Sequence, residues 1–194
     1  MDTTIFHWIN NLAEHIAWAN SAVSFYAKNG VVLFALLLVI AYLTARTRNI
    51  AAVAGTVWAG ASAIVALLVA QSIGRPINRA RPYATLRTVH LLVDKSTDFS
   101  FPSDHAATVG AVAVGLLLVN RRLGIIATVA AIVMAIARVY VGAHYPSDVL
   151  AGLAIGGTVA AVGARVVVPM TARVLGTFLS TPLRPLVTII SPTT

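Results

Sequence analysis

The chain has 194 residues, of which 58% are hydrophobic and 10% are charged, a composition too apolar for an ordinary soluble domain. The formal net charge of +8 does not indicate nucleic-acid binding, because the arginines lie between apolar segments rather than on one polar face. The sequence contains no cysteine, which excludes disulfides and thiolate metal sites. We therefore expect one integral membrane domain over residues 1–194, with anionic lipid headgroups or phosphate-bearing molecules as its charged partners.

Residues 1–28 predict a helix that lies along the membrane interface. They lack a basic region followed by a continuous apolar core, so a cleaved signal peptide is not expected. The apolar residues that recur there at helical spacing are Ile5, Trp8, Ile9, Leu12, Ile16 and Ala19. This prediction places Trp8 and Trp18 at headgroup depth, and an ordinary packed helix is an equal alternative.

Five later segments approach the roughly 20 apolar residues that a helix needs to cross a bilayer. They are residues 29–45, 49–73, 104–120, 122–141 and 148–169. Glycine and alanine are dense in the second, third and fifth segments, as in membrane helices that pack closely. The sequence therefore predicts an all-α, polytopic transmembrane bundle of about five spans, followed by a cytoplasmic tail over residues 171–194.

The connections between the expected spans divide into short basic turns and a long polar loop. Counting the spans places the two short turns and the tail on one face, and residues 74–103 and 138–147 on the other. The turns and the tail carry Arg46, Arg48, Arg121, Arg122, Arg173 and Arg184. The positive-inside rule predicts that their face is cytoplasmic, although the other face also carries basic residues and the rule alone leaves the orientation open.

Three polar clusters lie on the face of the long loop. They are residues 74–83 (GRPINRARPY), 101–106 (FPSDHA) and 137–148 (ARVYVGAHYPSD). Polar groups at a membrane edge are costly unless they are paired or functional. The convergence of these clusters on one face therefore predicts a functional site.

Arginine and serine residues of the clusters are suited to bind an anion. Arg81 and Arg138 carry planar, permanently charged guanidinium groups that can bind phosphate oxygens through two donors each. Ser103 precedes an expected helix, where its hydroxyl can cap and the exposed backbone N–H groups favour an anion. Together the three residues predict a phosphate-binding site.

Two histidines and an aspartate add reactive groups. Asp148 follows His144 by four residues, so its carboxylate can accept the ring N–H of His144 and leave the other nitrogen free to attack. His105 can then donate a proton to the departing oxygen. Each residue alone has an ordinary structural explanation, but their combination on one face predicts a nucleophile, its orienting group and a general acid.

The clusters resemble the three motifs of the type 2 phosphatidic acid phosphatase (PAP2) superfamily, which are Lys-x6-Arg-Pro, Pro-Ser-Gly-His and Ser-Arg-x5-His-x3-Asp. The resemblance covers residues 74–148 directly, and as a three-part signature it is highly specific. It implies the helical fold that this superfamily shares with vanadate-dependent haloperoxidases. Those haloperoxidases are soluble, and the continuous apolar spans argue against that group.

The resemblance also implies a role for each residue of the site. The implied phosphate ligands are Arg81, Ser103 and Arg138, with Pro82 completing the first motif. His144 would form a phosphohistidine that water then hydrolyses, Asp148 would be its partner, and His105 would be the general acid. No metal or diffusible cofactor is implied, and the sequence has no acidic cluster suitable for Mg²⁺.

Two departures from the motifs concern the first and third clusters. The motif lysine falls at Gly74, so Arg75 or Arg79 would have to supply its charge. Ala137 stands where the third motif has serine, which removes a hydroxyl but no charged group. The identity of the first-motif cation is therefore left open between two arginines.

A third departure is Asp104, which replaces the glycine of the second motif. In this respect the sequence is similar to the bacterial undecaprenyl pyrophosphate phosphatase branch. The carboxylate of Asp104 would favour the imidazolium form of His105, or would serve only as a negative charge at a helix N-terminus, and both explanations are equally good.

The sequence thus predicts an enzyme that hydrolyses undecaprenyl, or another polyprenyl, pyrophosphate to the monophosphate and inorganic phosphate, recycling the lipid carrier of the cell wall. The alternatives are a phosphatase of glycerolipids such as phosphatidic acid or phosphatidylglycerol phosphate, and a non-enzymatic lipid transporter. We expect a multi-pass protein of the bacterial plasma membrane with its site on the extracytoplasmic side. The sequence leaves open the length of the lipid tail, the oligomeric state, a homo-oligomer included, and the role of residues 84–99.

Overall fold

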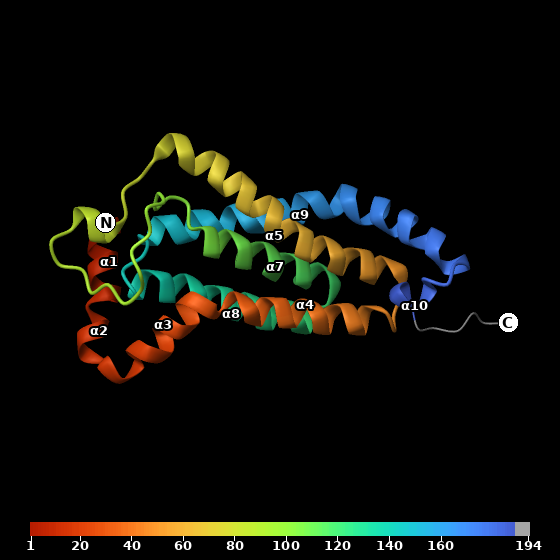
Figure 1. Cartoon of the computed structure of the whole chain (residues 1–194), viewed down its shortest axis with the longest axis horizontal. Helices are drawn as coiled ribbons and strands as arrows, with labels where there is room; N and C mark the ends of the chain where they lie inside the picture. The colour runs from red at the N-terminus through yellow and green to blue at the C-terminus, as the bar shows by residue number, and fades with distance from the viewer. Residues whose placement is uncertain (189–194) are drawn as a thin grey trace.

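The computed structural model describes residues 1–188, which lie almost entirely in helices and include no strand. Figure 1 shows α4, α5, α7, α8 and α9 running along the long axis of the molecule. The helices are α1 (Asp2–Asn10), α2 (Leu12–His15), α3 (Asn20–Asn29), α4 (Val31–Ala45), α5 (Ile50–Ile77), α6 (Pro82–Thr85), α7 (Asp104–Val119), α8 (Arg121–Tyr140), α9 (Pro146–Thr177) and α10 (Arg184–Val187). Two 3-10 turns, η1 (Ala17–Ala19) and η2 (Phe178–Ser180), complete the order.

The long helices begin where the sequence offers a capping side chain. The Asn49 side chain accepts from a backbone amide of the first turn of α5, and Ser103 does the same for α7. Asn120 ends α7 and caps α8, accepting from two amides of the next turn. Pro146 occupies the first turn of α9, where its missing N–H costs nothing.

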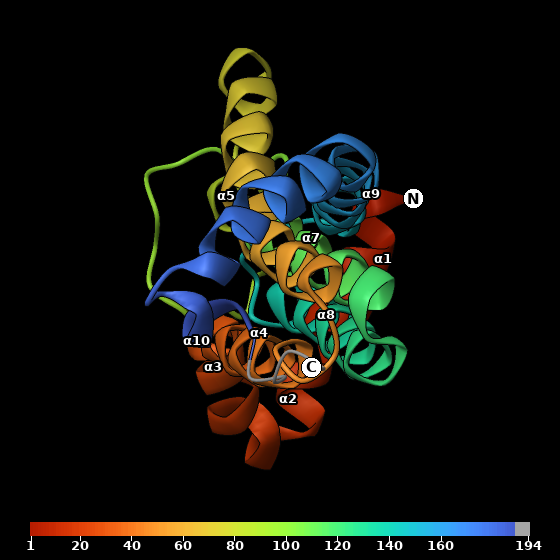
Figure 2. The ribbon, with the colours of Figure 1, turned by 90° about the vertical axis from the view of Figure 1, so that its right-hand side faces the viewer.

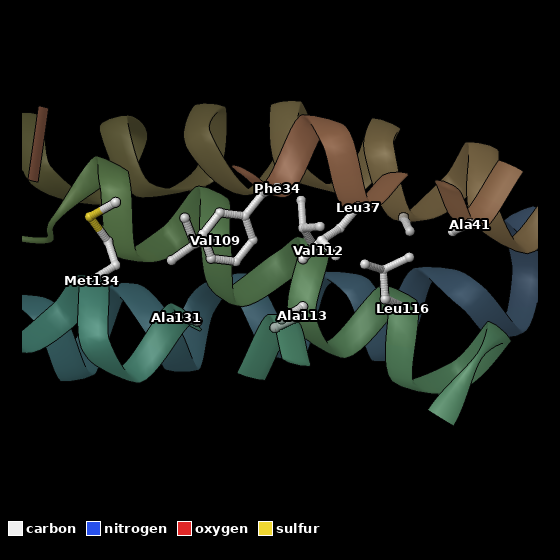
Figure 3. Close-up of a cluster of buried hydrophobic side chains, with 11 residues drawn as sticks. Phe34, Leu37, Ala41, Val109, Val112, Ala113, Leu116, Ala131 and Met134 are labelled. Carbon is white, nitrogen blue, oxygen red and sulfur yellow. The ribbon is translucent and has the colours of Figure 1, made fainter. Parts of the chain in front are cut away.

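α7 lies at the centre of the bundle and packs against α4, α5, α8 and α9 (Figure 2). In the core cluster of Figure 3, Val109 and Leu116 of α7 pack against Phe34 of α4 and Met134 of α8. The surrounding helices keep large apolar side chains exposed on their outer faces, Leu150 among them. This distribution is the one expected where lipid, rather than water, covers the outer surface.

Three segments are long and apolar enough to cross a bilayer, namely Ile50–Thr85, Arg121–Tyr140 and Pro146–Ser180. The segments Ala17–Asn29 and Val31–Ala45 form a pair bent by 56° that would make a fourth. α7 has 16 residues and a length of about 24 Å, which is short for a full span. The all-α, multi-pass architecture is confirmed, whereas the expected number of five spans stays a prediction.

Glycines let α9 approach α7 closely. A Cβ atom at Gly152 would lie 2.5 Å from the carbonyl oxygen of Ser103, and one at Gly156 would lie 2.0 Å from that of Ala107. The two glycines are four residues apart, which is the spacing of close-packed membrane helices. Their contact fixes the start of α7 against the start of α9, where the polar clusters lie.

The N-terminal segment differs from the single interfacial helix that its apolar pattern predicts. It is broken into α1, α2, η1 and α3, with breaks at Asn11 and Ile16. In α1, Phe6 and Asn10 are buried, whereas Trp8 is exposed. The physical reason is that Asn10 donates to the carbonyl oxygens of His90 and Tyr140 at 2.9 and 2.7 Å, which ties α1 to the bundle.

The C-terminal segment begins later than expected, because α9 continues through Pro169 to Thr177. The tail then returns to the turn between α4 and α5, where Tyr42 and Arg46 donate to carbonyl groups of α10. This agrees with the expectation that the tail lies beside the short basic turns. The last part of the predicted tail, residues 189–194, lies outside the described residues.

Candidate active site

The three polar clusters meet at one end of the bundle, near the N-terminus in Figure 1, where α6, the start of α7, the end of α8 and the start of α9 come together. The amide of Ser103 donates to the carbonyl oxygen of Asp148 at 3.0 Å, which joins the second cluster to the third. Arg81 Nη1 donates to the carbonyl oxygen of Ala143 at 3.2 Å, which joins the first cluster to the third. The structure therefore brings together stretches that are distant along the chain.

His144 lies in a tight turn between α8 and α9, and its side chain is almost fully buried. Its amide donates to the carbonyl oxygen of Arg138 at 3.3 Å. Gly142 in this turn has a φ of 79°, and a Cβ atom there would lie 2.8 Å from Val89 and 2.9 Å from the carbonyl oxygen of His90. Only glycine meets both requirements, so Gly142 shapes the turn that presents His144.

The hydrogen bonds of His144 define which ring nitrogen carries the proton. Nδ1 lies 2.8 Å from the carbonyl oxygen of Ser100, and Nε2 lies 3.3 Å from Nη1 of Arg81. A carbonyl can only accept and a guanidinium can only donate, so Nδ1 is protonated and Nε2 keeps its lone pair. Burial lowers the pKa of His144 well below its usual range, and the positive charges of Arg138 and Arg81 lower it further. The His144 ring is therefore neutral in the folded protein, and its Nε2 carries no proton.

Asp148 does not accept the ring N–H of His144, contrary to the sequence-based prediction. His144 Nδ1 and Asp148 Oδ2 are 3.9 Å apart. Asp148 Oδ2 instead accepts from the Tyr145 amide at 2.9 Å and from the Ser100 hydroxyl at 2.5 Å. The reason is helix capping, because Asp148 is the third residue of α9 and its carboxylate folds back onto the helix N-terminus. Asp148 therefore reaches His144 only through Ser100.

Arg79 is bound into the protein. Its Nη1 donates to Asp148 at 2.6 Å and to Ser147 Oγ at 2.7 Å, and its Nη2 donates to Asp2 at 2.7 Å. The guanidinium also stacks on Tyr145, 3.9 Å from the ring centroid. Burial alone would raise the pKa of Asp2, but hydrogen bonds from Ser147 and Arg79 hold it below its usual range. These contacts position Arg79 as a support for Asp148.

Position 74, where the motif lysine would fall, has no room for a side chain. Gly74 is buried, and a Cβ atom there would lie 2.1 Å from the Phe99 ring and 2.6 Å from the carbonyl oxygen of Phe101. Arg75, the other candidate replacement, is exposed at the end of α5. Neither Arg75 nor the carboxylate-bound Arg79 contacts His144 among the described interactions, so the two arginines next to the reactive groups are Arg81 and Arg138.

The other expected phosphate ligands lie beside the histidines. Arg138 is 8% exposed and donates through Nη1 to the carbonyl oxygen of Ala27, while its Nε has no hydrogen-bond partner within residues 1–188. Ser103 is buried, and its hydroxyl accepts from the Ala106 amide at 3.4 Å. His105 is half-buried, and Arg81 and Arg138 act electrostatically on it as they do on His144. One donor of Arg138 is thus left without a partner in a buried site that also holds the charge of Arg81.

Asp104 contacts α5. Its Oδ2 accepts from Nε2 of Gln71 at 2.9 Å, and its Oδ1 has no partner within the described residues. This contact gives no support to the idea that Asp104 holds His105 as an imidazolium. Asp104 is the first residue of α7, so its carboxylate lies at the N-terminus of that helix. This is the position that the alternative explanation, a negative charge at a helix N-terminus, requires.

A cavity of about 280 Å³ borders the site and is lined by loop residues 96–99 together with Arg81 and Tyr83. Arg81 Nε donates to the carbonyl oxygen of Asp98 at 3.0 Å, so Arg81 links this loop to His144. Among residues 1–188, no group of three or more histidine or acidic side chains is arranged to hold a metal ion. The site thus consists of a buried, neutral histidine with Arg81 and Arg138 close to it.

Two residues of this arrangement were missed by sequence reasoning. Ser100 lies one residue before the second cluster. It contacts His144 through its backbone carbonyl group, which every residue has, so no residue pattern predicts this contact. Asp2 lies 145 residues from its partner Ser147, and nothing in the sequence connects them. Only the close approach of α1 to α9 reveals the second contact.

The sequence is similar to known proteins of one family. The family model described as the PAP2 superfamily matches residues 55–171. Undecaprenyl-diphosphatase BcrC of Bacillus subtilis is 31% identical over 155 residues, which are 80% of this chain and 78% of the relative. The protein named bacitracin transport permease protein BcrC of Bacillus licheniformis is 32% identical over 151 residues, which are 78% of this chain and 73% of the relative.

A solved structure shows the same fold. The crystal structure of Aquifex aeolicus LpxE superposes with a TM-score of 0.64 and covers 84% of this chain and 94% of its own. Its sequence identity of 23% is low, so the likeness concerns the arrangement of helices.

Proposed function

Since the chain belongs to the PAP2 superfamily, we propose that it hydrolyses undecaprenyl, or another polyprenyl, pyrophosphate to the monophosphate and inorganic phosphate. The name of the Bacillus subtilis relative, matched over most of both chains, supports this substrate. The observation that carries the proposal is the neutral ring of His144, whose Nε2 lone pair lies beside Arg81 in a buried site. A histidine in this state can attack phosphorus directly.

The proposed reaction has two steps. Nε2 of His144 attacks the terminal phosphorus, and the bond from that phosphorus to the bridging oxygen breaks. His105, after it takes up a proton, donates that proton to the departing monophosphate. Water then attacks the phosphohistidine and transfers a proton to His105, and the N–P bond breaks. Inorganic phosphate leaves, and both imidazoles return to their starting states.

The arginines and Ser103 would hold the non-bridging oxygens. Arg138 Nε has no partner within residues 1–188 and is free to donate to a phosphate oxygen. Arg81 can exchange its contact with His144 for one with the arriving phosphate, which frees Nε2 at the moment when it is needed. The start of α7, capped by Ser103, adds backbone N–H groups that favour an anion.

We place the protein in a bacterial plasma membrane with this site on the extracytoplasmic side. The six acidic residues of the sequence all belong to the site end, and they are Asp2, Glu14, Asp94, Asp98, Asp104 and Asp148. They offset most of the positive charge there. The opposite end carries seven arginines without a carboxylate, so the positive-inside rule supports a cytoplasmic location for that end.

Phosphate release by the purified protein tests the proposal. Polyprenyl pyrophosphate, phosphatidic acid and phosphatidylglycerol phosphate are compared in mixed micelles, and we expect the highest kcat/KM for the pyrophosphate. His144→Ala should lower that rate by at least about 1,000-fold, whereas His15→Ala, an exposed histidine outside the site, should not. Faster release from a glycerolipid would show that the glycerolipid, and not the polyprenyl pyrophosphate, is the preferred substrate. Full activity of His144→Ala would refute the mechanism through His144. No release from any of the three lipids would favour the transporter alternative.

A further inference from the structure

A second cavity, of about 510 Å³, lies between α5, α7 and α9 at the end of the bundle away from His144. Its wall includes Leu118 near the end of α7, whereas His105 lies at the start of that helix. The rise of an α-helix separates these two positions by about 20 Å. Figure 2 views the molecule from this end, where α5, α7 and α9 lie together. The cavity is therefore distinct from the candidate active site.

Most residues in the wall of this cavity are apolar. α9 contributes Ala161, Ala164 and Val168, which share one face of the helix. Trp58 of α5 forms part of the wall, and its indole N–H donates to the carbonyl oxygen of Ala160 at 2.9 Å. Because that N–H is satisfied within the protein, the indole offers the cavity an apolar surface. Such a wall suits an acyl chain rather than a soluble metabolite.

Two arginines line the same cavity. Arg48 donates through Nη1 to the carbonyl oxygen of Val119 at 2.9 Å, which anchors it at the end of α7 while its other donors remain available. Arg165 is exposed and is the only charged residue of α9 between Asp148 and Arg173. Guanidinium groups of this kind bind phosphate oxygens through paired donors.

The charge of the whole end favours an anion. It carries the seven arginines of the two short turns, the second half of α9 and α10, and none of the six acidic residues of the sequence belongs to it. The arginines are Arg46, Arg48, Arg121, Arg122, Arg165, Arg173 and Arg184. A ligand with a phosphate group and apolar chains complements both the charge and the wall of the cavity.

We propose that this cavity binds an anionic glycerophospholipid of the surrounding membrane, with the phosphate at Arg48 and Arg165 and an acyl chain against Trp58. Basic pockets between membrane helices are known to hold such headgroups. The bound lipid would fill the space between α5, α7 and α9 at the end of the bundle opposite the candidate active site. This site is independent of the phosphatase reaction.

Quenching of Trp58 fluorescence by brominated lipids tests the proposal. The chain has three tryptophans, and the exposed Trp8 and Trp18 can be replaced by phenylalanine so that Trp58 is the only tryptophan and can be excited selectively. The full-length Trp8→Phe/Trp18→Phe protein is placed in phosphatidylcholine nanodiscs, and brominated phosphatidylglycerol or brominated phosphatidylcholine is added at equal fractions. We expect an apparent association about tenfold tighter for phosphatidylglycerol, from two arginines acting together.

The arginine variants separate a lipid site from general contact with the bilayer. Arg165→Gln alone should weaken the preference for phosphatidylglycerol, and Arg48→Gln/Arg165→Gln together should bring the two lipids to equal quenching. Arg122→Gln, at the same end but outside the cavity, should keep the full preference. Arg165 makes no described contact, so its single variant keeps the test valid if the double variant fails to fold. Equal quenching by both lipids in the parent protein, or a preference that Arg165→Gln leaves unchanged, would overturn the proposal.

Discussion

Ser100 connects His144 to Asp148 although it belongs to none of the three polar clusters. Its carbonyl oxygen accepts from Nδ1 of His144, and its hydroxyl donates to the carboxylate of Asp148. Arg79 holds the other oxygen of that carboxylate. The orientation of the imidazole thus depends on the backbone of one loop residue, and Asp148 fixes that residue in place.

Ser100→Ala should therefore reduce kcat about tenfold, the effect of losing a hydrogen bond to a charged group. KM should change little, because Arg81 and Arg138 are left intact. Steady-state kinetics with polyprenyl pyrophosphate measure both values, and Ser72→Ala, an exposed serine of α5, is the control. A loss that appears in KM alone, or no loss, would show that the Ser100 hydroxyl does not position His144.

The burial of neutral His144 should make the protein less stable in mild acid. An unfolded histidine titrates near pH 6.5, whereas the pKa of folded His144 lies well below that value because of burial and nearby arginines. Between the two values the unfolded state binds a proton that the folded state does not, so stability is full above the unfolded pKa and falls as the pH falls below it. Asp2, whose folded pKa is lowered, keeps its contribution until far more acidic pH.

Melting temperatures of the detergent-solubilised protein at pH 7 and pH 5 measure this effect. The unchanged protein should lose stability between the two values, and His144→Asn should lose less, because the substituted side chain does not titrate. An equal loss in both proteins would show that protonation of His144 does not account for the difference.

At the scale of helices, the seam between α7 and α9 sets the distance between Ser103 and the turn of His144. Gly156→Ala would place a methyl group against the carbonyl oxygen of Ala107 and should destabilise the protein by roughly 1 to 3 kcal/mol. It should also lower phosphatase activity, because the two helix starts move apart.

Gly176→Ala provides a matched control on the same helix. No atom lies within 4 Å of a Cβ at Gly176, so this change should leave activity intact and stabilise α9 by up to about 1 kcal/mol. Thermal melting and phosphate release compare the two variants. A Gly156→Ala protein as stable and active as Gly176→Ala would contradict the role of the seam.

The helices were predictable where apolar length and capping residues agree. The apolar segments predicted to begin at residues 49, 104 and 122 start within one residue of α5, α7 and α8, and Ser103 caps α7 as expected. The N-terminal segment was not predictable, because Asn10 is polar in the pattern and yet buried by its contacts with other parts of the chain. A residue whose burial depends on tertiary hydrogen bonds gives no signal in local periodicity.

At the scale of the whole molecule, the motifs predicted which stretches converge but not how the side chains pair. His144 and Asp148 have the spacing of a direct pair, and helix capping separates them. Arg79 has the positive charge of a phosphate ligand, but its guanidinium is already paired with the carboxylates of Asp2 and Asp148. Such pairings depend on geometry across the bundle, which residue spacing does not encode.

The distribution of charge between the two ends predicts an extracytoplasmic active site. Because the sequence has no cysteine, single introduced cysteines can report accessibility. They are placed at exposed Lys95 in the site-end loop or at exposed Arg122 in the first turn of α8. A membrane-impermeant maleimide added to intact cells should label Lys95→Cys and should label Arg122→Cys only after the membrane is broken. The reverse pattern would contradict the proposed orientation.

The most direct test of the account is recovery of the phosphoryl group on His144. The protein is mixed with polyprenyl pyrophosphate labelled in its terminal phosphate, quenched in base within one turnover, and its peptides are sequenced by mass spectrometry. We predict a phosphohistidine at His144, which accumulates in His105→Asn because deprotonation of the attacking water is slowed, and which is missing in His144→Asn. Label on any other residue, or phosphate release that proceeds without a labelled protein, would contradict the assignment of His144 as the nucleophile.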